Sequence, residues 1–148
     1  TLEPGSLAGS TSWAVWQLEQ VAVTVSSRGD AADEFAADIE LPEPIRRAID
    51  ELGFTRLTRV QAEVLPLSLA GRDVVAQAQT GSGKTAAYLL TIFSHILANP
   101  RTTPPETPRA LIVAPTRELA VQIAKDAEAL GHHAGIRSHV VFGGLDYR

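Results

Sequence analysis

The chain has 148 residues, of which 45% are hydrophobic and 20% are charged, and its formal net charge is −4. This length suits one domain with a sizeable core, and the composition excludes a disordered or fibrous protein. The acidic balance excludes a generic polycation that coats nucleic acid, although it leaves room for local phosphate contacts.

No apolar run reaches the length of a membrane span, and no basic region followed by an apolar stretch opens the chain. The chain also contains no cysteine, which excludes disulfides and thiolate zinc sites. We therefore expect a protein without a membrane partner, and a cytoplasmic location agrees with this cysteine usage.

Residues 1–33 form an N-terminal extension that is the least informative part of the chain. Val21, Val23 and Val25 alternate with small or polar residues, which predicts a strand. The rest of the extension is expected to pack without a specific role or to be disordered. One role left open is that the extension covers an open edge of a sheet.

Two helices are predicted next, over residues 42–53 and 58–71. Pro42 suits the first turn of the first helix, and Gly53 suits its C-terminal cap. The apolar positions of this helix are spaced for one buried face: Ile45, Ala48, Ile49 and Leu52. In the second helix, Pro66 should produce a kink or an early end.

Gln61, near the start of the second helix, admits two roles. Thr58 and Gln61 have the spacing of a capping box, in which each side chain binds the backbone N–H of the other residue. A carboxamide also matches the paired acceptor and donor of adenine. From this helix alone, the cap is the favoured interpretation. The nucleotide-binding motif about twenty residues further on reverses this preference, because a bound nucleotide would need a pocket for its base.

A glycine-rich turn over residues 78–85 joins an apolar strand, residues 73–76, to a helix, residues 84–98. Gly81 and Gly83 allow positive φ and close backbone approach. Successive N–H groups can therefore point into one concavity at the positive end of the helix. Such a concavity suits a chain of phosphates.

Two side chains at the end of this turn complete the pattern. Lys84 supplies a mobile charge for the outer phosphates of a nucleoside triphosphate, and Thr85 supplies a hydroxyl for the Mg²⁺ that travels with it. The strict phosphate-loop motif has glycine where Ala78 stands, but the flanking strand and helix meet the structural context that the motif requires. The predicted nucleotide-binding residues are Ala78, Gln79, Thr80, Gly81, Ser82, Gly83, Lys84 and Thr85.

A third strand is predicted over residues 110–114, because a continuous apolar run of this length is typical of a parallel sheet covered on both faces. The sequence Pro-Thr-Arg-Glu-Leu-Ala follows it at residues 115–120. Thr116 is expected to cap a helix that ends at Gly131 and buries Leu119, Ile123 and Leu130. Taken in isolation, residues 116–118 are explained by a cap and an exposed ion pair.

A fourth strand is predicted over residues 139–142, and Gly143 and Gly144 mark a turn at its end. Ligands of open α/β sheets bind at the carboxyl ends of strands, where this turn, residues 115–120 and residues 78–85 all lie. Two glycines would let a nucleic-acid backbone approach closely, and a plain tight turn explains them equally well. The four histidines lack metal-ligand spacing.

In this order, these motifs resemble those of the DEAD-box ATP-dependent RNA helicases. The resemblance is carried by Gly53, Phe54, Gln61, residues 78–85, residues 115–120, Gly143 and Gly144. It covers about residues 35–148 and implies an α/β P-loop NTPase fold, with a RecA-like parallel sheet flanked by helices. Residues 34–148 would then be an incomplete first RecA-like domain.

The resemblance implies ATP with Mg²⁺ as cofactor and RNA as partner, contacted largely through its sugar-phosphate backbone. Lys84 and Thr85 would be catalytic, with Thr85 as the metal ligand. The base pocket would involve Gln61, Phe54 and the stacking residue Phe35. The RNA contacts would be Pro115, Thr116, Arg117, Glu118, Gly143 and Gly144. The family usually has proline where Leu57 and Arg59 stand, and Phe35 lies one residue further from Gly53 than usual.

The 148 residues contain no Asp-Glu-Ala-Asp motif, no Ser-Ala-Thr motif and no second RecA-like domain, which the resemblance implies as a partner. We therefore expect this segment alone neither to hydrolyse ATP at a useful rate nor to unwind RNA. An unpaired sheet edge should also make it prone to aggregation or partial disorder. One alternative is a noncatalytic ATP- or RNA-binding module in a naturally short form. Another is an unrelated P-loop NTPase, which would leave residues 115–120 without a role.

Overall fold

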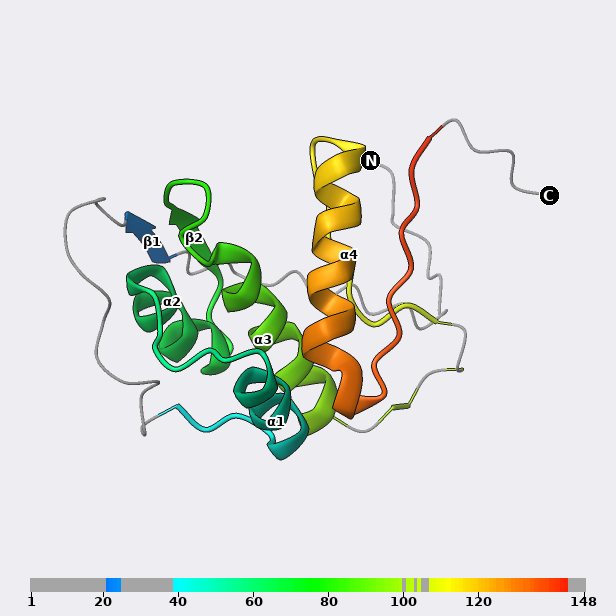
Figure 1. Ribbon diagram of the computed structural model, residues 1–148, viewed down its shortest axis with the longest axis horizontal. Helices are drawn as coiled ribbons and strands as arrows, with labels where there is room; N and C mark the ends of the chain where they lie inside the picture. The colour runs from blue at the N-terminus through cyan, green and yellow to red at the C-terminus, as the bar shows by residue number, and fades with distance from the viewer. Residues whose placement is uncertain (1–20, 25–38, 100, 103, 105–106, 144–148) are drawn as a thin grey trace, which may run out of the picture.

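Figure 1 shows a computed structural model of the chain, which describes residues 21–24, 39–99, 101–102, 104 and 107–143. Phe35, Val25 and Gly144 lie outside the described residues. The elements in chain order are β1 (Val21–Thr24), α1 (Glu43–Glu51), α2 (Arg59–Leu69), β2 (Val74–Gln77), α3 (Lys84–Ala98), α4 (Arg117–Gly131) and the 3₁₀ helix η1 (His132–Ala134). None of the helices in the described part combines the length and apolar character that a bilayer crossing requires.

The helices begin and end close to the predicted positions because their capping residues act as expected. Pro42 is the N-cap of α1, and Gly53 follows its C-terminus with φ +70°. Thr58 caps α2, and Thr116 caps α4. Pro66 does not end α2, which continues to Leu69 with this proline on its exposed side.

The core is formed by helices, with α3 at its centre. α3 contacts α1, α2 and α4, and α1 also contacts α4 (Figure 1). Leu89 and Leu90 of α3 are almost completely buried. Their cluster includes Ile45 and Ile49 of α1, Leu65 of α2, Ala127 and Leu130 of α4, and Leu57 from the loop before α2. Burial on several sides fixes the position of α3, and therefore of the turn that precedes it.

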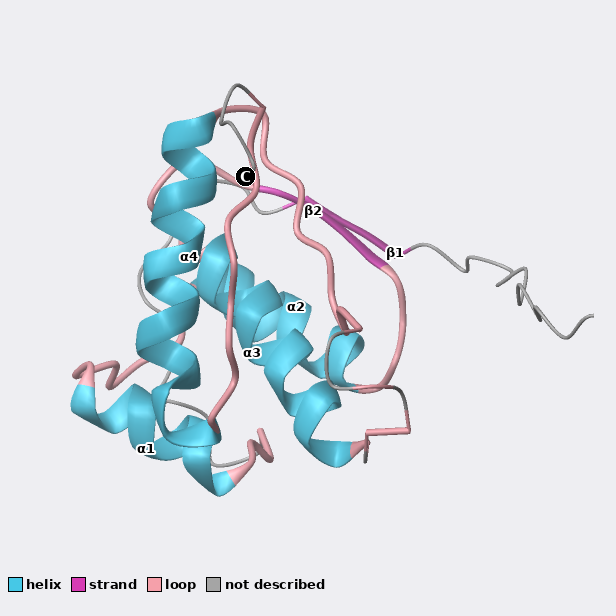
Figure 2. Cartoon of the chain, turned by 90° about the vertical axis from the view of Figure 1, so that its right-hand side faces the viewer, coloured by secondary structure: helices cyan, strands magenta, loops and turns pink. Residues whose placement is uncertain are grey.

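The sheet pairs a strand of the N-terminal extension with the strand that precedes the glycine-rich turn. β1 and β2 are parallel, and their register aligns Val21 with Val74 and Thr24 with Gln77. Figure 2 shows the two strands side by side. The predicted strand in the extension is confirmed, and it covers one edge of β2, the role that the sequence left open.

Two predicted strands, over residues 110–114 and 139–142, are wrong for this structure. Both segments lie outside the β1–β2 ladder, which is the only strand pairing among the described residues. Leu111 and Val113 are 86% and 84% exposed, and Val141 is 75% exposed. A strand needs a neighbour for its backbone hydrogen bonds, and these apolar runs have none in the described part of the chain.

Leu119 of α4 is 40% exposed, in contrast to its predicted burial. The buried residues of α4 are Ile123, Ala127, Leu130 and Gly131, which all lie beyond its first turn. Figure 1 shows the reason, because the N-terminal end of α4 extends past the helices that cover its other end. The spacing of apolar residues predicted the correct face of the helix but not how far along it the core reaches.

Candidate functional site

The glycine-rich turn joins β2 directly to the N-terminus of α3, as predicted. Gly81 has φ +80° and Gly83, the N-cap of α3, has φ +88°. Other residues rarely adopt these angles, so both positions favour glycine. The curled backbone leads into the positive end of a 15-residue helix, where an anion is favoured by the helix dipole and by free N–H groups.

Gly83 is also required because there is no space for a side chain. A Cβ atom at this position would lie 2.6 Å from Nε2 of Gln61 and 2.8 Å from Oγ1 of Thr58. At Gly81, a Cβ atom would have no neighbour within 4 Å. The two glycines therefore serve different purposes, since Gly81 provides only a backbone angle while Gly83 also allows α2 to approach the turn.

The Lys84 ammonium group folds back onto the turn. Its Nζ donates to the carbonyl oxygens of Ala78 at 2.5 Å and Gln79 at 2.6 Å, and it lies 3.3 Å from Oγ of Ser82. The charge is thus held at the mouth of the loop by neutral acceptors. Phosphate oxygens would be stronger partners for it, because they carry a negative charge that attracts the ammonium group in addition to accepting its hydrogen bonds.

Thr85 is half-buried in the first turn of α3, one helical turn before Tyr88. Burial raises the pKa of Tyr88, the side-chain hydrogen bond with Thr85 lowers it, and the charge of Asp126 raises it further. A hydroxyl has one proton and two lone pairs, so Thr85 can contact Tyr88 and still offer an oxygen to a cation. Among the described residues no cluster of His, Cys, Asp or Glu could hold a metal alone, so a cation here must bring further ligands with it.

Gln61 links the start of α2 to the turn. Its Oε1 accepts from the Thr58 backbone N–H at 2.9 Å, and its Nε2 donates to the Gly83 carbonyl oxygen at 3.1 Å. The Gln61 backbone N–H in turn reaches Oγ1 of Thr58, which completes the predicted capping box. The carboxamide keeps one lone pair and one N–H beyond these contacts, which is the combination that adenine would need.

The other residues predicted for the base pocket are less well placed. Phe54 follows the end of α1 and is 41% exposed, and no ring contact among the described residues joins it to the turn. Leu57, where the resembled family has proline, is 1% exposed and belongs to the core. The role of Phe54 therefore stays a prediction, as does that of Phe35.

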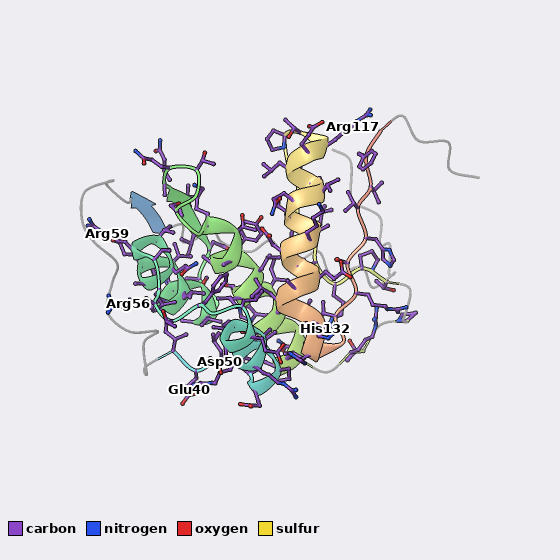
Figure 3. The ribbon with its side chains drawn as sticks, viewed as in Figure 1. Glu40, Asp50, Arg56, Arg59, Arg117 and His132 are labelled. Carbon is purple, nitrogen blue, oxygen red and sulfur yellow. The ribbon has the colours of Figure 1, made fainter. Side chains whose placement is uncertain are left out.

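The residues predicted to contact RNA gather at the N-terminus of α4. Pro115, Thr116, Arg117 and Glu118 are all exposed, and Oγ1 of Thr116 accepts from the Leu119 N–H at 3.2 Å. Figure 3 shows Arg117 at this end of the helix, and Figure 1 shows the glycine-rich turn at the same end of the molecule. A nucleotide and a nucleic acid would therefore meet the same side of the domain.

Phe142 is a neighbour that the sequence did not assign to the site. Its ring lies under the guanidinium group of Arg117, with 5.5 Å between Cζ and the ring centroid. The exposed Gly143 follows at once, so the structure brings two of the predicted RNA contacts together around this ring. The sequence feature that could have indicated Phe142 is its position as an aromatic residue directly before a glycine pair.

A separate hollow of about 490 Å³ lies between α1 and α4. Its lining residues are Ala48, Glu51, Leu52, Lys125, Glu128, Ala129 and His132, none of which belongs to the turn. Beside it, Nε2 of His133 lies 2.6 Å from Oε2 of Glu51 and joins η1 to α1. The His133–Glu51 contact is structural, and none of the residues predicted to bind nucleotide or RNA lines this hollow.

Comparison with known proteins agrees with these motifs. The sequence model of the DEAD/DEAH box helicase family matches residues 58–148. The ATP-dependent RNA helicase RhlB of Idiomarina loihiensis is 50% identical over 112 residues, which are 75% of this chain and 26% of that protein. RhlB of Pectobacterium carotovorum is 46% identical over 123 residues, covering 82% of this chain and 29% of the relative. The chain thus spans about a quarter of the length of the curated relatives that it matches.

Solved structures give the same result for the fold. The RNA helicase Prp28 of Chaetomium thermophilum, bound to ADP, superposes with a TM-score of 0.69 at 31% identity, over 83% of this chain and 30% of that one. A hypothetical ATP-dependent RNA helicase of Sulfolobus tokodaii gives 0.62 at 39% identity, over 72% and 29%. The predicted α/β fold of the RecA-like type is confirmed, and the chain belongs to the DEAD/DEAH box helicase family.

Proposed function

We propose that this chain is the nucleotide-binding and RNA-contacting part of an ATP-dependent RNA helicase. The observation that carries the proposal is the turn after β2, with Gly81 and Gly83 at positive φ and Lys84 at its mouth. Membership of the DEAD/DEAH box family and the names of the curated relatives support it. Residues 34–148 would form part of the first RecA-like domain, working in the cytoplasm where ATP and RNA meet.

The turn would bind the phosphates of ATP. Backbone N–H groups of Gly81 and Gly83 would hold phosphate oxygens, and that of Ser82 would join them by releasing its 3.3 Å hydrogen bond to the Gln79 carbonyl oxygen. Lys84 would exchange its two carbonyl partners for the outer phosphates. The neighbouring residues Ala78, Gln79 and Thr80 would shape the approach to the turn. Gln61, and with it Phe35 and Phe54, would face the base.

Mg²⁺ would arrive with the triphosphate. The Thr85 hydroxyl is the protein ligand that the turn offers, and the phosphates and water would supply the remaining oxygens, as Mg²⁺ usually requires. A bound Mg²⁺ would supply positive charge that neutralises the phosphate oxygens. The protein's own part is to orient the phosphates through Lys84 and the loop N–H groups.

RNA would be held at the N-terminus of α4 and the turn that follows Phe142. Pro115, Thr116, Arg117, Glu118, Gly143 and Gly144 are the residues proposed for this contact. Sugar and phosphate contacts position a strand without reading its bases, so we expect little dependence on RNA sequence.

A titration with Mg-ATP tests the nucleotide site directly. Backbone amide signals of Gly81, Gly83 and Lys84 should shift, and those of Gly135, a glycine of similar positive φ in the turn after η1, should not. If the loop signals stay unmoved in a folded sample, the proposal is wrong.

A noncatalytic ATP- or RNA-binding module is the second candidate, and the family and its named relatives do not favour it. RNA-stimulated phosphate release separates the two functions. It is measured on the protein that carries this chain together with a second RecA-like domain. We expect release that Lys84→Ala abolishes, whereas a noncatalytic module would bind both ligands without turnover.

A further inference from the structure

Arg117 and Phe142 are 25 positions apart in the sequence but form one cation–π pair. Arg117 is the first residue of α4, and Phe142 ends the extended segment that follows η1. The Arg117 Cζ atom lies 5.5 Å from the centre of the ring, within the range of a cation–π contact. The arginine is exposed and the phenylalanine is half-buried, so the ring supports a group that faces solvent.

The position of Arg117 is unfavourable for the helix itself. A cation in the first turn opposes the positive end of the helix dipole, where an acidic residue such as Glu118 is preferred. Helix stability therefore does not explain the arginine. A bound anion would explain it, because the N-terminus of α4 and the guanidinium group would attract the anion together.

The contact with the ring prepares the guanidinium group for such an anion. A cation–π contact does not occupy the N–H donors with an acceptor atom, so they stay available to a ligand. Two in-plane donors match two oxygens of a phosphate. A long side chain that is already held by a ring also loses less conformational freedom when the ligand binds.

The surface next to the Arg117–Phe142 pair is open at Gly143. Gly143 follows Phe142 directly, and a Cβ atom built on it would meet nothing within 4 Å. The two residues that flank the ring, Arg117 in space and Gly143 in sequence, are both proposed RNA contacts. Phe142 thus connects the motif at residues 115–120 with the glycine pair at residues 143–144.

We propose that Phe142 is a positioning residue that holds the Arg117 guanidinium group in the orientation that binds an RNA phosphate. This inference rests on the proposed function, because it needs Arg117 to contact RNA. It adds a residue whose ring acts through Arg117 and does not itself read a base.

The test measures binding of a fluorescent oligouridylate to the intact protein with saturating Mg-ATP. Phe142→Leu removes the aromatic face at similar volume and should weaken binding by about 2- to 5-fold, which corresponds to the strength of an exposed cation–π contact. Phe142→Tyr keeps the face and should bind within about 2-fold of the natural protein. Arg117→Ala should weaken binding by about 10-fold or more and reduce the slope of log K against log salt by about 0.7.

The double variant decides whether Phe142 acts through Arg117. In the Arg117→Ala background, Phe142→Leu should have no further effect, because the group that it positions is gone. An equal loss in both backgrounds would overturn the inference, since the ring would then act on RNA or on the fold directly. Mg-ATP affinity and melting temperature are measured for every variant as controls, so that a loss of RNA affinity can be distinguished from a loss of nucleotide binding or of the fold.

Two outcomes separate this inference from the proposed function. If Arg117→Ala leaves RNA affinity unchanged, the proposed RNA contact is wrong and the inference falls with it. If Arg117→Ala weakens binding but Phe142→Leu does not, only the inference is wrong. Should Phe142→Leu fail to fold, Arg117→Lys replaces it, because lysine keeps the charge but lacks the planar group. Full RNA affinity in that variant would also overturn the inference.

Discussion

The side-chain amide of Gln61 donates a hydrogen bond to the backbone carbonyl oxygen of Gly83 over 3.1 Å, and this contact joins the N-terminus of α2 to the N-terminus of α3. The sequence presented capping and base recognition as competing roles for Gln61. In the structure, the capping box is formed and the same carboxamide also reaches the phosphate loop. A residue that holds the loop can therefore affect nucleotide binding even without touching the base.

The first prediction separates these roles of Gln61. Gln61→Ala removes both side-chain contacts and should lower the free energy of unfolding by about 1–3 kcal/mol, because the Thr58 N–H and the Gly83 carbonyl lose their partner. Gln61→Glu keeps an oxygen for the Thr58 N–H but loses the donor to Gly83. Denaturant titrations and the ratio of ATP to GTP affinity should be measured for both variants.

If Gln61 recognises adenine, both variants should reduce the preference for ATP over GTP. An unchanged ratio in Gln61→Ala, with a clear loss of stability, would leave capping and loop support as its only roles. Glu63→Ala is a matched control, because Glu63 lies two positions later in α2 and forms an exposed ion pair with Arg59 at 2.9 Å. Surface pairs of this kind contribute less than about 1 kcal/mol.

The second prediction concerns the two glycines of the loop. Gly81→Ala should cost about 1–2 kcal/mol of stability from its positive φ alone. Gly83→Ala should cost about 1–3 kcal/mol more than that, because the new methyl group would overlap the Gln61 and Thr58 side chains. Thermal unfolding of both variants, with Gly135→Ala as a control at φ +62° in open space, measures the difference.

A double variant shows whether the overlap is the cause. In a Gln61→Ala background, the additional cost of Gly83→Ala should become smaller, because one of the two crowding side chains is gone. Equal costs for Gly81→Ala and Gly83→Ala would instead mean that only the backbone angle matters.

These contacts show what could be predicted from the sequence and what could not. The helix ends and the glycine-rich turn were predicted because each depends on residues close together in the chain, such as Thr58 with Gln61 or Gly83 with Lys84. The strand predicted over residues 110–114 does not form in the structure, because apolar composition predicts an extended chain but not a hydrogen-bonding neighbour.

Contacts between distant residues have no local pattern at all. The strand in the extension was predicted, but its parallel register with β2 came only from the structure. The stack of Arg117 on Phe142 likewise depends on how α4 and the segment after η1 return to the same place. Residue types indicate the chemistry of a site, whereas its long-range members depend on the path of the chain.

The third prediction concerns Lys84. Lys84→Met removes the charge at the mouth of the loop and should weaken Mg-ATP binding by about 10- to 100-fold, as expected for hydrogen bonds to a charged group. Lys84→Arg should restore only part of the affinity, since the planar guanidinium group does not fit a site for a compact ammonium. Calorimetric titration with Mg-ATP provides the measurement.

Lys125→Met is the matched control for lost charge, because Lys125 lines the hollow between α1 and α4. It should leave Mg-ATP affinity unchanged. A similar loss in both lysine variants would indicate a general effect of charge and not a contact with phosphate.

The fourth prediction uses the pair of Glu51 and His133. The hydrogen bond from His133 lowers the pKa of Glu51 below its ordinary value, and desolvation opposes this. The charge of His133 and the hydrogen bond and charge of Arg47 lower it further. Because the pKa is lower in the folded protein, the stabilisation is fully present above the ordinary carboxylate pKa of about 4.3. It is lost as the pH falls through the folded pKa.

Glu51→Gln removes the ionisable group and should therefore lower the melting temperature at pH 6 but have little effect at pH 3. Melting curves of the natural protein and the variant across this range give the difference at each pH. Asp50→Asn, one position earlier in α1, is the control for loss of a surface carboxylate from the same helix.

His133→Gln should reduce the pH-dependent difference, because His133 is the main source of the lower pKa and joins η1 to α1 at 2.6 Å. A melting difference for Glu51→Gln that is the same at pH 3 and pH 6 would show that the contact stabilises the fold without depending on the carboxylate charge.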